Sequence, residues 1–154
     1  MKAVDGMMDA SGRRIGIVVS RWNEYVTKML LEGALEELKT HGDPQVTVVR
    51  VPGAWEMPVA ARALIEEEKV DAVVALGCIL QGATSHAAQL TEDVSSSLMR
   101  MQIETRTPIA WGVLTPESQE QAIERSGMKL GNKGREAALA AVEMMNVLSA
   151  MRSK

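Results

Sequence analysis

The chain is poor in the residues that would indicate a metal centre, a disulfide framework or a nucleic-acid surface. It holds one cysteine, two histidines, one tyrosine and no phenylalanine, and its formal net charge is -3. Cys78 cannot form an intramolecular disulfide, and its place at the end of an apolar run indicates a buried thiol rather than a nucleophile. Two histidines far apart make no metal-ligand cluster, so we expect no metal. Without a basic excess, we expect no nucleic-acid partner.

A signal sequence and a membrane-spanning run are also missing. The N-terminal stretch MKAVDGMMDASGRR carries acids and glycines where a signal peptide needs an apolar core. No apolar run approaches the length of a membrane span. We therefore expect a cytoplasmic protein with no membrane partner. The length suits one domain, residues 1–154, with a full hydrophobic core.

What the sequence does have is a series of short apolar runs that alternate with segments of helical period. The predicted strands are 15–20, 46–51, 71–80 and 108–114. Because these runs are apolar throughout, they indicate a parallel sheet that helices cover on both faces. The sequence thus predicts an α/β fold, a three-layer αβα sandwich with a four-stranded parallel sheet.

The helix ends are marked by capping residues and glycines. His41 precedes Gly42 and is explained by its place at a helix end. Thr115, with Pro116 after it, predicts the capped start of a short helix that runs to Gly127. After a glycine-rich hinge at 131–134, the spacing predicts a terminal helix over 135–151.

Ligand sites in open parallel sheets lie beyond the carboxyl ends of the strands. The segments that follow the predicted strands are 20–25, 52–58, 81–86 and 110–117. All three tryptophans, Trp22, Trp55 and Trp111, fall in or beside them. Any one of them could simply fill a gap under a loop, but three together favour a flat, stacking-prone pocket.

The segment QGATSH (81–86) has the features of an anion site at the start of a helix. Small residues allow backbone N–H groups to approach a ligand, and Thr84 and Ser85 offer hydroxyls. His86 is either a core histidine paired with a carbonyl or a general acid and base, and its position favours the second role. Arg125 and GNKG (131–134) could complete a phosphate site, or could be a helix end and a hinge; spacing leaves both open.

Four ordered blocks carry a resemblance to a known family. They are RIGIVVSRWN, VPGAWEMP, LGCILQGATSH and GVLTPESQEQAIERSGMKLGNKGREAA. With these blocks in this order, almost the whole chain resembles the 6,7-dimethyl-8-ribityllumazine synthases. The resemblance implies a flavodoxin-like fold and a transferase of riboflavin biosynthesis. The implied reaction condenses 5-amino-6-(ribitylamino)uracil with 3,4-dihydroxy-2-butanone 4-phosphate, releasing phosphate and two waters, without a metal or organic cofactor.

The resemblance also implies a role for each matching residue. His86 matches the proton shuttle, and Trp22 matches the residue that stacks on the pyrimidine, with Asn23 beside it. Trp55 and Glu56 match the segment that holds the ribityl chain, and the backbone at Ile79 and Leu80 faces the uracil edge. The phosphate site matches Gly82, Ala83, Thr84 and Arg125. Lys133 and Trp111 match positions that reach the pocket from an adjoining subunit.

A shared pocket implies a homo-oligomer. Pentamers are the basic unit of the family, alone, stacked in pairs, or as twelve in a 60-subunit icosahedral shell. In such assemblies the N-terminal segment adds a strand to a neighbour's sheet. The compact GMKLGNKG turn resembles that of shell-forming members. Such a shell could enclose riboflavin synthase as a partner.

The chain departs from the family pattern around the histidine. Trp22 replaces the usual phenylalanine, and Gln81 replaces an arginine that many members carry. Ala87, Ala88 and Gln89 replace aromatic and acidic residues. These changes keep two other functions open, a flavin- or lumazine-binding module and a cage-forming scaffold. The retained residues Glu56, Thr84, His86, Arg125 and Lys133 favour the enzyme.

Overall fold

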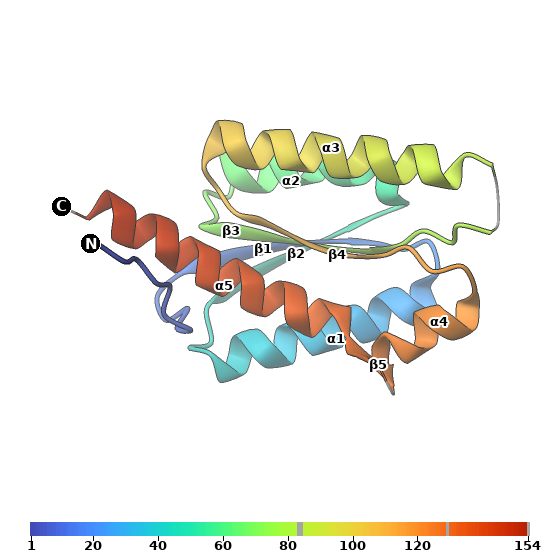
Figure 1. The fold of residues 1–154 in the computed structure, drawn as a ribbon, viewed down its shortest axis with the longest axis horizontal. Helices are drawn as coiled ribbons and strands as arrows, with labels where there is room; N and C mark the ends of the chain where they lie inside the picture. The colour runs from blue at the N-terminus through green and yellow to red at the C-terminus, as the bar shows by residue number, and fades with distance from the viewer. Residues whose placement is uncertain (83–84, 129, 154) are drawn as a thin grey trace.

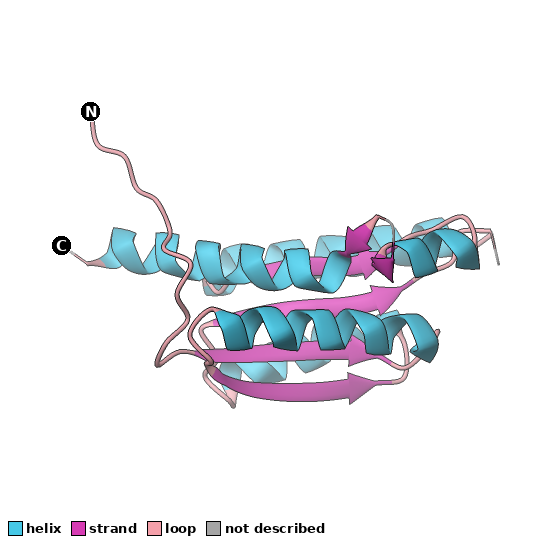
Figure 2. Ribbon diagram, turned by 90° about the horizontal axis from the view of Figure 1, so that it is seen from below, coloured by secondary structure: helices cyan, strands magenta, loops and turns pink. Residues whose placement is uncertain are grey.

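A computed structural model, which describes residues 1–82, 85–128 and 130–153, contains a parallel sheet between two layers of helices. Its strands are β1 (Arg14–Ser20), β2 (Gln45–Val51), β3 (Ala72–Cys78) and β4 (Ile109–Leu114), in the spatial order β2-β1-β3-β4. All three neighbouring pairs are parallel, and Figure 2 shows the arrows pointing one way. The predicted αβα sandwich with a four-stranded parallel sheet is confirmed.

Helices cover both faces of this sheet (Figure 1). One face carries α1 (Glu24–Thr40) and α5 (Lys133–Arg152), and the other carries α2 (Met57–Glu66) and α3 (Ala87–Thr105). Alternate residues of β3 supply the two cores, so Val74 and Leu76 pack under α1 and α5 while Val73 and Ala75 pack under α2 and α3. Since both faces are buried, the strand is apolar throughout its length.

The N-terminal segment lies against its own chain. Across the described residues 1–13 there is no strand, yet Ala10 is fully buried. Asn146 of α5 donates from Nδ2 to the carbonyl oxygens of Met7 at 2.6 Å and Asp9 at 2.8 Å. The guanidinium of Arg13 donates to Asn146 Oδ1 at 3.1 Å. Pairing of this segment with a neighbouring sheet stays a prediction.

The short helix α4 (Gln119–Glu124) begins later than the sequence predicts. Its N-cap is Ser118, whose Oγ accepts from the N–H of Gln121 at 3.3 Å, and not Thr115. The reason is a contact from outside the segment, because the carbonyl of Pro116 accepts from the N–H of Gln81 at 2.9 Å. That contact ties residues 115–117 to the loop after β3.

The end of this helix and the start of the last one also differ from the prediction. Helix α4 stops at Glu124, and β5 (Ser126–Met128) pairs antiparallel with β6 (Gly131–Asn132). The region 131–134 is not a hinge, because Asn132 caps α5 and helix α5 begins at Lys133 rather than at 135. Gly134 allows α5 to approach α1, since a Cβ there would lie 2.0 Å from the carbonyl oxygen of Leu30.

His41 does lie at a helix end, as predicted. It is the C-cap of α1, and its backbone N–H donates to the carbonyl of Glu37 at 3.0 Å. Its ring Nδ1 lies 3.3 Å from the carboxylate of the same residue. No helix in the described part of the chain is long and apolar enough to span a membrane.

Candidate active site

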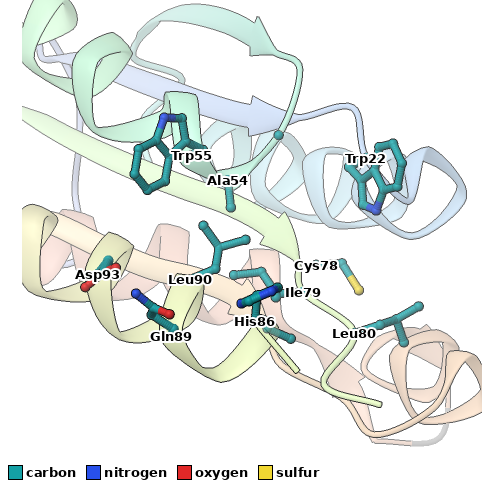
Figure 3. A pocket seen from close by; sticks show the side chains of 12 residues that line it. Trp22, Ala54, Trp55, Cys78, Ile79, Leu80, His86, Gln89, Leu90 and Asp93 are labelled. Carbon is teal, nitrogen blue, oxygen red and sulfur yellow. The ribbon is translucent and has the colours of Figure 1, made fainter. Parts of the chain in front are cut away.

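A cavity of about 460 Å³ opens at the carboxyl ends of β1, β2 and β3, between the 3₁₀ turn η1 (Ala54–Glu56) and the start of α3 (Figure 3). This is where ligand sites occur in open parallel sheets. Its lining consists of Trp22, Gly53, Ala54, Trp55, Cys78, Ile79, Leu80, His86, Ala87, Gln89, Leu90 and Asp93. Three sequence segments predicted to carry the site thus meet in one place.

Two tryptophans form the aromatic walls of the cavity. Trp22 and Trp55 are 73% and 71% exposed, so most of their surface is not buried by packing within the chain. In Figure 3 the two rings stand apart, Trp55 on η1 and Trp22 after β1, with His86 across from them at the start of α3. The N–H of Trp22 donates to the carbonyl of Pro52 at 3.1 Å, which extends the β1–β2 pairing and holds both walls together. Such rings can stack on a flat heterocycle.

Asn23 sits behind the cavity and joins two strand ends. Its φ of 62° is left-handed, a conformation that asparagine tolerates, and it precedes the first residue of α1. Its Nδ2 donates to the carbonyl of Cys78 at 3.0 Å. The side chain faces a second cavity of about 270 Å³ between α1 and α4 rather than the first. Asn23 therefore holds the end of β1 against the end of β3, and its predicted contact with the pyrimidine substrate stays a prediction.

The floor of the cavity is apolar. Cys78 and Ile79 are buried, and the N–H of Ile79 donates to the carbonyl of Leu114 at 2.8 Å. Burial raises the pKa of the Cys78 thiol to about 11, so the thiol is protonated at neutral pH. The prediction that this cysteine is buried is therefore confirmed, and the floor offers a water-excluding surface.

Gln81 connects this floor to α3. Its Nε2 donates to the carbonyl of Ile79 at 3.0 Å and to Oγ1 of Thr91 at 3.1 Å. Gln81 occupies the position where many lumazine synthases carry an arginine. Its amide holds the loop against α3 and supplies no charge.

His86 is the residue directly before α3, and its carbonyl accepts from the N–H of Leu90 at 2.9 Å. Its ring lines the cavity near the positive end of the helix dipole. Gln89 and Asp93 follow on the same side of the helix and line the cavity too (Figure 3). Neither position was predicted to line the site, although spacings of three and seven residues from His86 place both on its side of the helix.

The predicted phosphate residues come from neighbouring segments. Gly82 lies against the loop before α4, since a Cβ there would be 3.1 Å from the carbonyl oxygen of Glu117. Arg125 is the C-cap of α4 and is exposed. Ala83 and Thr84 lie outside the described residues, as does any contact they make.

The cavity lining within a single chain lacks Glu56, Trp111 and Lys133, in addition to Asn23, Gly82 and Arg125. Glu56 accepts from the N–H of Gly53 at 3.1 Å and lines an adjacent groove of about 610 Å³ between α2 and α3. The groove and the cavity share Trp55 and Asp93, so Glu56 borders the site rather than entering it.

Trp111 and Lys133 lie further from the cavity than Glu56, on other elements of the fold. Trp111 is half-buried on β4 and packs on the core cluster beneath α2 and α3. Lys133 begins α5, on the opposite face of the sheet. The interpretation that all three tryptophans share one pocket is therefore wrong within a single chain. Their roles in an adjoining subunit's pocket remain predictions.

No group of three or more His, Cys, Asp or Glu side chains among the described residues is placed to hold a metal ion. The cavity instead combines flat aromatic walls, an apolar floor and a histidine at a helix start. Together with the strand order, these features define an α/β enzyme of the flavodoxin-like class with its site at the carboxyl edge of the sheet.

Comparison with known proteins identifies the particular family. Residues 12–149 match the 6,7-dimethyl-8-ribityllumazine synthase family. The 6,7-dimethyl-8-ribityllumazine synthase of Aquifex aeolicus is 46% identical over 154 residues, which cover 99% of this chain and 100% of the relative. That of Edwardsiella ictaluri is 47% identical over 156 residues, with the same coverage. The chain belongs to the 6,7-dimethyl-8-ribityllumazine synthase family, which confirms the resemblance.

Proposed function

We propose that the chain is a transferase that condenses 5-amino-6-(ribitylamino)uracil with 3,4-dihydroxy-2-butanone 4-phosphate. The products are 6,7-dimethyl-8-ribityllumazine, phosphate and two waters, in the penultimate step of riboflavin biosynthesis. The observation that carries the proposal is the cavity in which Trp22, Trp55 and His86 meet. It occurs in a chain that is similar to lumazine synthases over nearly its whole length.

The cavity suits the first part of this reaction. The pyrimidine stacks on Trp22 over the apolar floor, which excludes water while the amine attacks the ketone to give an imine. His86 faces this volume and moves protons as phosphate is eliminated and the ring closes. A general acid or base placed in this way contributes about 10²- to 10⁴-fold in rate.

The phosphate of the ketone belongs on the α4 side of His86. Arg125 offers a planar guanidinium that can bind two phosphate oxygens at once, which a lysine cannot do. Gly82 allows close approach of the backbone, and the start of α3 adds its dipole. Glu56 and Trp55 hold the ribityl chain where the cavity meets the α2–α3 groove.

The complete site requires an oligomer, and the pentamer is its basic unit, alone or in a 60-subunit shell in the cytoplasm. Support comes from Lys133 and the half-buried Trp111, which match family positions at the pocket but do not line the cavity of their own chain. Light scattering of the purified protein tests this assembly. A fully active monomer would contradict it.

A flavin- or lumazine-binding module is the second candidate function. It is favoured by Trp22, whose exposed ring exceeds a phenylalanine in area, and by the alanines that follow His86. The two candidates differ in turnover, since a binding module would hold the product without forming it.

The experiment that tests the enzyme measures lumazine and phosphate together after the two substrates are mixed with the protein. Equal amounts of both, formed faster than in the uncatalysed reaction, support the proposal. Arg125→Ala should raise the KM for the phosphorylated ketone about 10- to 150-fold, the loss of a charge-assisted contact. The control Arg152→Ala, at the far end of α5, should not change it. If Arg125→Ala forms lumazine with the same KM for the phosphorylated ketone as the wild-type protein, the arginine does not bind the phosphate.

A further inference from the structure

The side chain of Asn132 is a buried polar group that connects three elements. It is 9% exposed. Its Nδ2 donates to the carbonyl of Met29 in α1 at 3.0 Å and to the carbonyl of Ser126 in β5 at 3.2 Å. Its Oδ1 accepts from the N–H of Arg135 at 3.0 Å, which caps α5. One acceptor and both amide hydrogens are therefore in use.

Arg125 is part of the same junction. Its carbonyl accepts from the N–H of Lys133 at 2.9 Å, next to Asn132 in the chain. Ser126, which follows Arg125, pairs with Asn132 in the β5–β6 hairpin, and its hydroxyl donates to the carbonyl of Ile123 at the end of α4. The backbone that carries the arginine is thus fixed from both sides.

The amide of Asn132 packs closely against Gly33 of α1. A Cβ on Gly33 of α1 would lie 2.5 Å from Asn132 Nδ2 and 2.6 Å from Oδ1. Because Gly33 has no side chain, the amide can approach the backbone of α1 closely enough to donate to the carbonyl of Met29. The contact is therefore built into two elements far apart in the sequence.

We propose that Asn132 is a positioning residue that holds Arg125 where its guanidinium binds the phosphate of the ketone. The inference rests on the proposed function. A helix cap alone needs only an acceptor, which serine or aspartate supplies as well. The two donations from Nδ2 are what an asparagine adds, and they tie the Arg125 side of the junction to α1.

Because Asn132 accepts one hydrogen bond and donates two, variants can remove the donations and keep the accepted bond. Asn132→Asp and Asn132→Ser keep an acceptor for the N–H of Arg135, so they preserve the start of α5 and with it Lys133. Both lose the Nδ2 amide that donates to the carbonyls of Met29 and Ser126 together. A displacement of about 1 Å at a substrate-positioning group can cost about a hundredfold, so a partial shift of Arg125 should weaken phosphate binding about tenfold.

Asn146 offers a matched control on the same helix. Its Nδ2 also donates to two carbonyls, those of Met7 and Asp9. Its Oδ1 also accepts one hydrogen bond, here from the guanidinium of Arg13. It lies fourteen residues further along α5, about 20 Å away at the rise of an α-helix. Asn146→Asp thus removes the same kind of contacts without touching the phosphate region.

The experiment measures, for the wild-type protein and the three variants, the melting temperature, the KM of each substrate and the dissociation constant of inorganic phosphate. We expect Asn132→Asp and Asn132→Ser to raise the KM of the phosphorylated ketone and the phosphate constant about tenfold, with the KM of the pyrimidine unchanged. Asn146→Asp should lower the melting temperature but leave all three constants unchanged. If Asn132→Asp does not fold, Asn132→Ser carries the test.

Unchanged phosphate binding in the folded Asn132 variants would overturn the inference, as would an equal loss in Asn146→Asp. If the wild-type protein forms no lumazine, the proposed function is wrong. The phosphate titration alone then tests whether Asn132 positions Arg125. Weaker phosphate binding in the Asn132 variants would then still support the positioning role, and equal binding would overturn it.

Discussion

Replacing Trp22 with alanine should weaken binding of the pyrimidine substrate and of the lumazine product without loss of stability. The residue is 73% exposed, so its truncation leaves no buried void and should change the free energy of unfolding by no more than about 0.5 kcal/mol. Stacking of an aromatic side chain on a base contributes about 1–3 kcal/mol by alanine substitution. The dissociation constant of the product should therefore rise about 5- to 150-fold.

Tyr25 provides the control for this prediction. It is an aromatic residue with the same 73% exposure, three positions further on, but it lines the α1–α4 cavity instead. Calorimetric titration of each variant with 6,7-dimethyl-8-ribityllumazine measures the effect, and Trp22→Phe should recover most of the affinity. Equal affinities for wild type and Trp22→Ala, or an equal loss in Tyr25→Ala, would refute the stacking argument.

Three further predictions concern the core and the proton chemistry. Gly134→Ala places a Cβ 2.0 Å from the carbonyl oxygen of Leu30. The clash should outweigh a helix-propensity gain of about 1 kcal/mol and lower the melting temperature by several degrees. An unchanged melting curve would contradict this. His86→Ala should lower kcat about 10²- to 10⁴-fold with the assembly unchanged in light scattering, and a normal kcat would exclude the proton role. Because burial raises the pKa of Cys78 from 9.0 to about 11, its thiol should resist alkylation at pH 8 in the folded state, and stability should fall as the pH rises between these values; rapid alkylation of the folded protein would contradict the burial.

The sheet was predictable because β1, β3 and β4 are buried on both faces, while the edge strand β2 is only partly buried. Runs such as 71–80 carry that burial in their composition alone, and the carboxyl-edge rule then places Trp22, Trp55 and His86 together. The cavity brings these three segments together as expected.

The errors occurred where contacts between distant segments override local signals. Thr115 has the chemistry of a cap, but the hydrogen bond from Gln81 to Pro116 delays the helix to Ser118. The β5–β6 hairpin is too short to show a period, and GNKG looks like a hinge until Asn132 is seen to cap α5.

The face on which a side chain lies was a second feature that the sequence did not reveal. Trp111 follows the alternation of β4, which points it beneath α2 and α3 rather than to the strand end. Glu56 turns back to the N–H of Gly53. Neither orientation is visible in the spacing of tryptophans and acids, because it depends on the register of the sheet and on a turn of three residues.

The structure of the protein with 6,7-dimethyl-8-ribityllumazine bound is the most direct test of the central claim, that the cavity between η1 and α3 is where lumazine is made. We predict the ring system against Trp22 within reach of His86, with the ribityl chain running towards Trp55. Product seated in the α1–α4 cavity, or in the α2–α3 groove with its ring away from His86, would contradict the account.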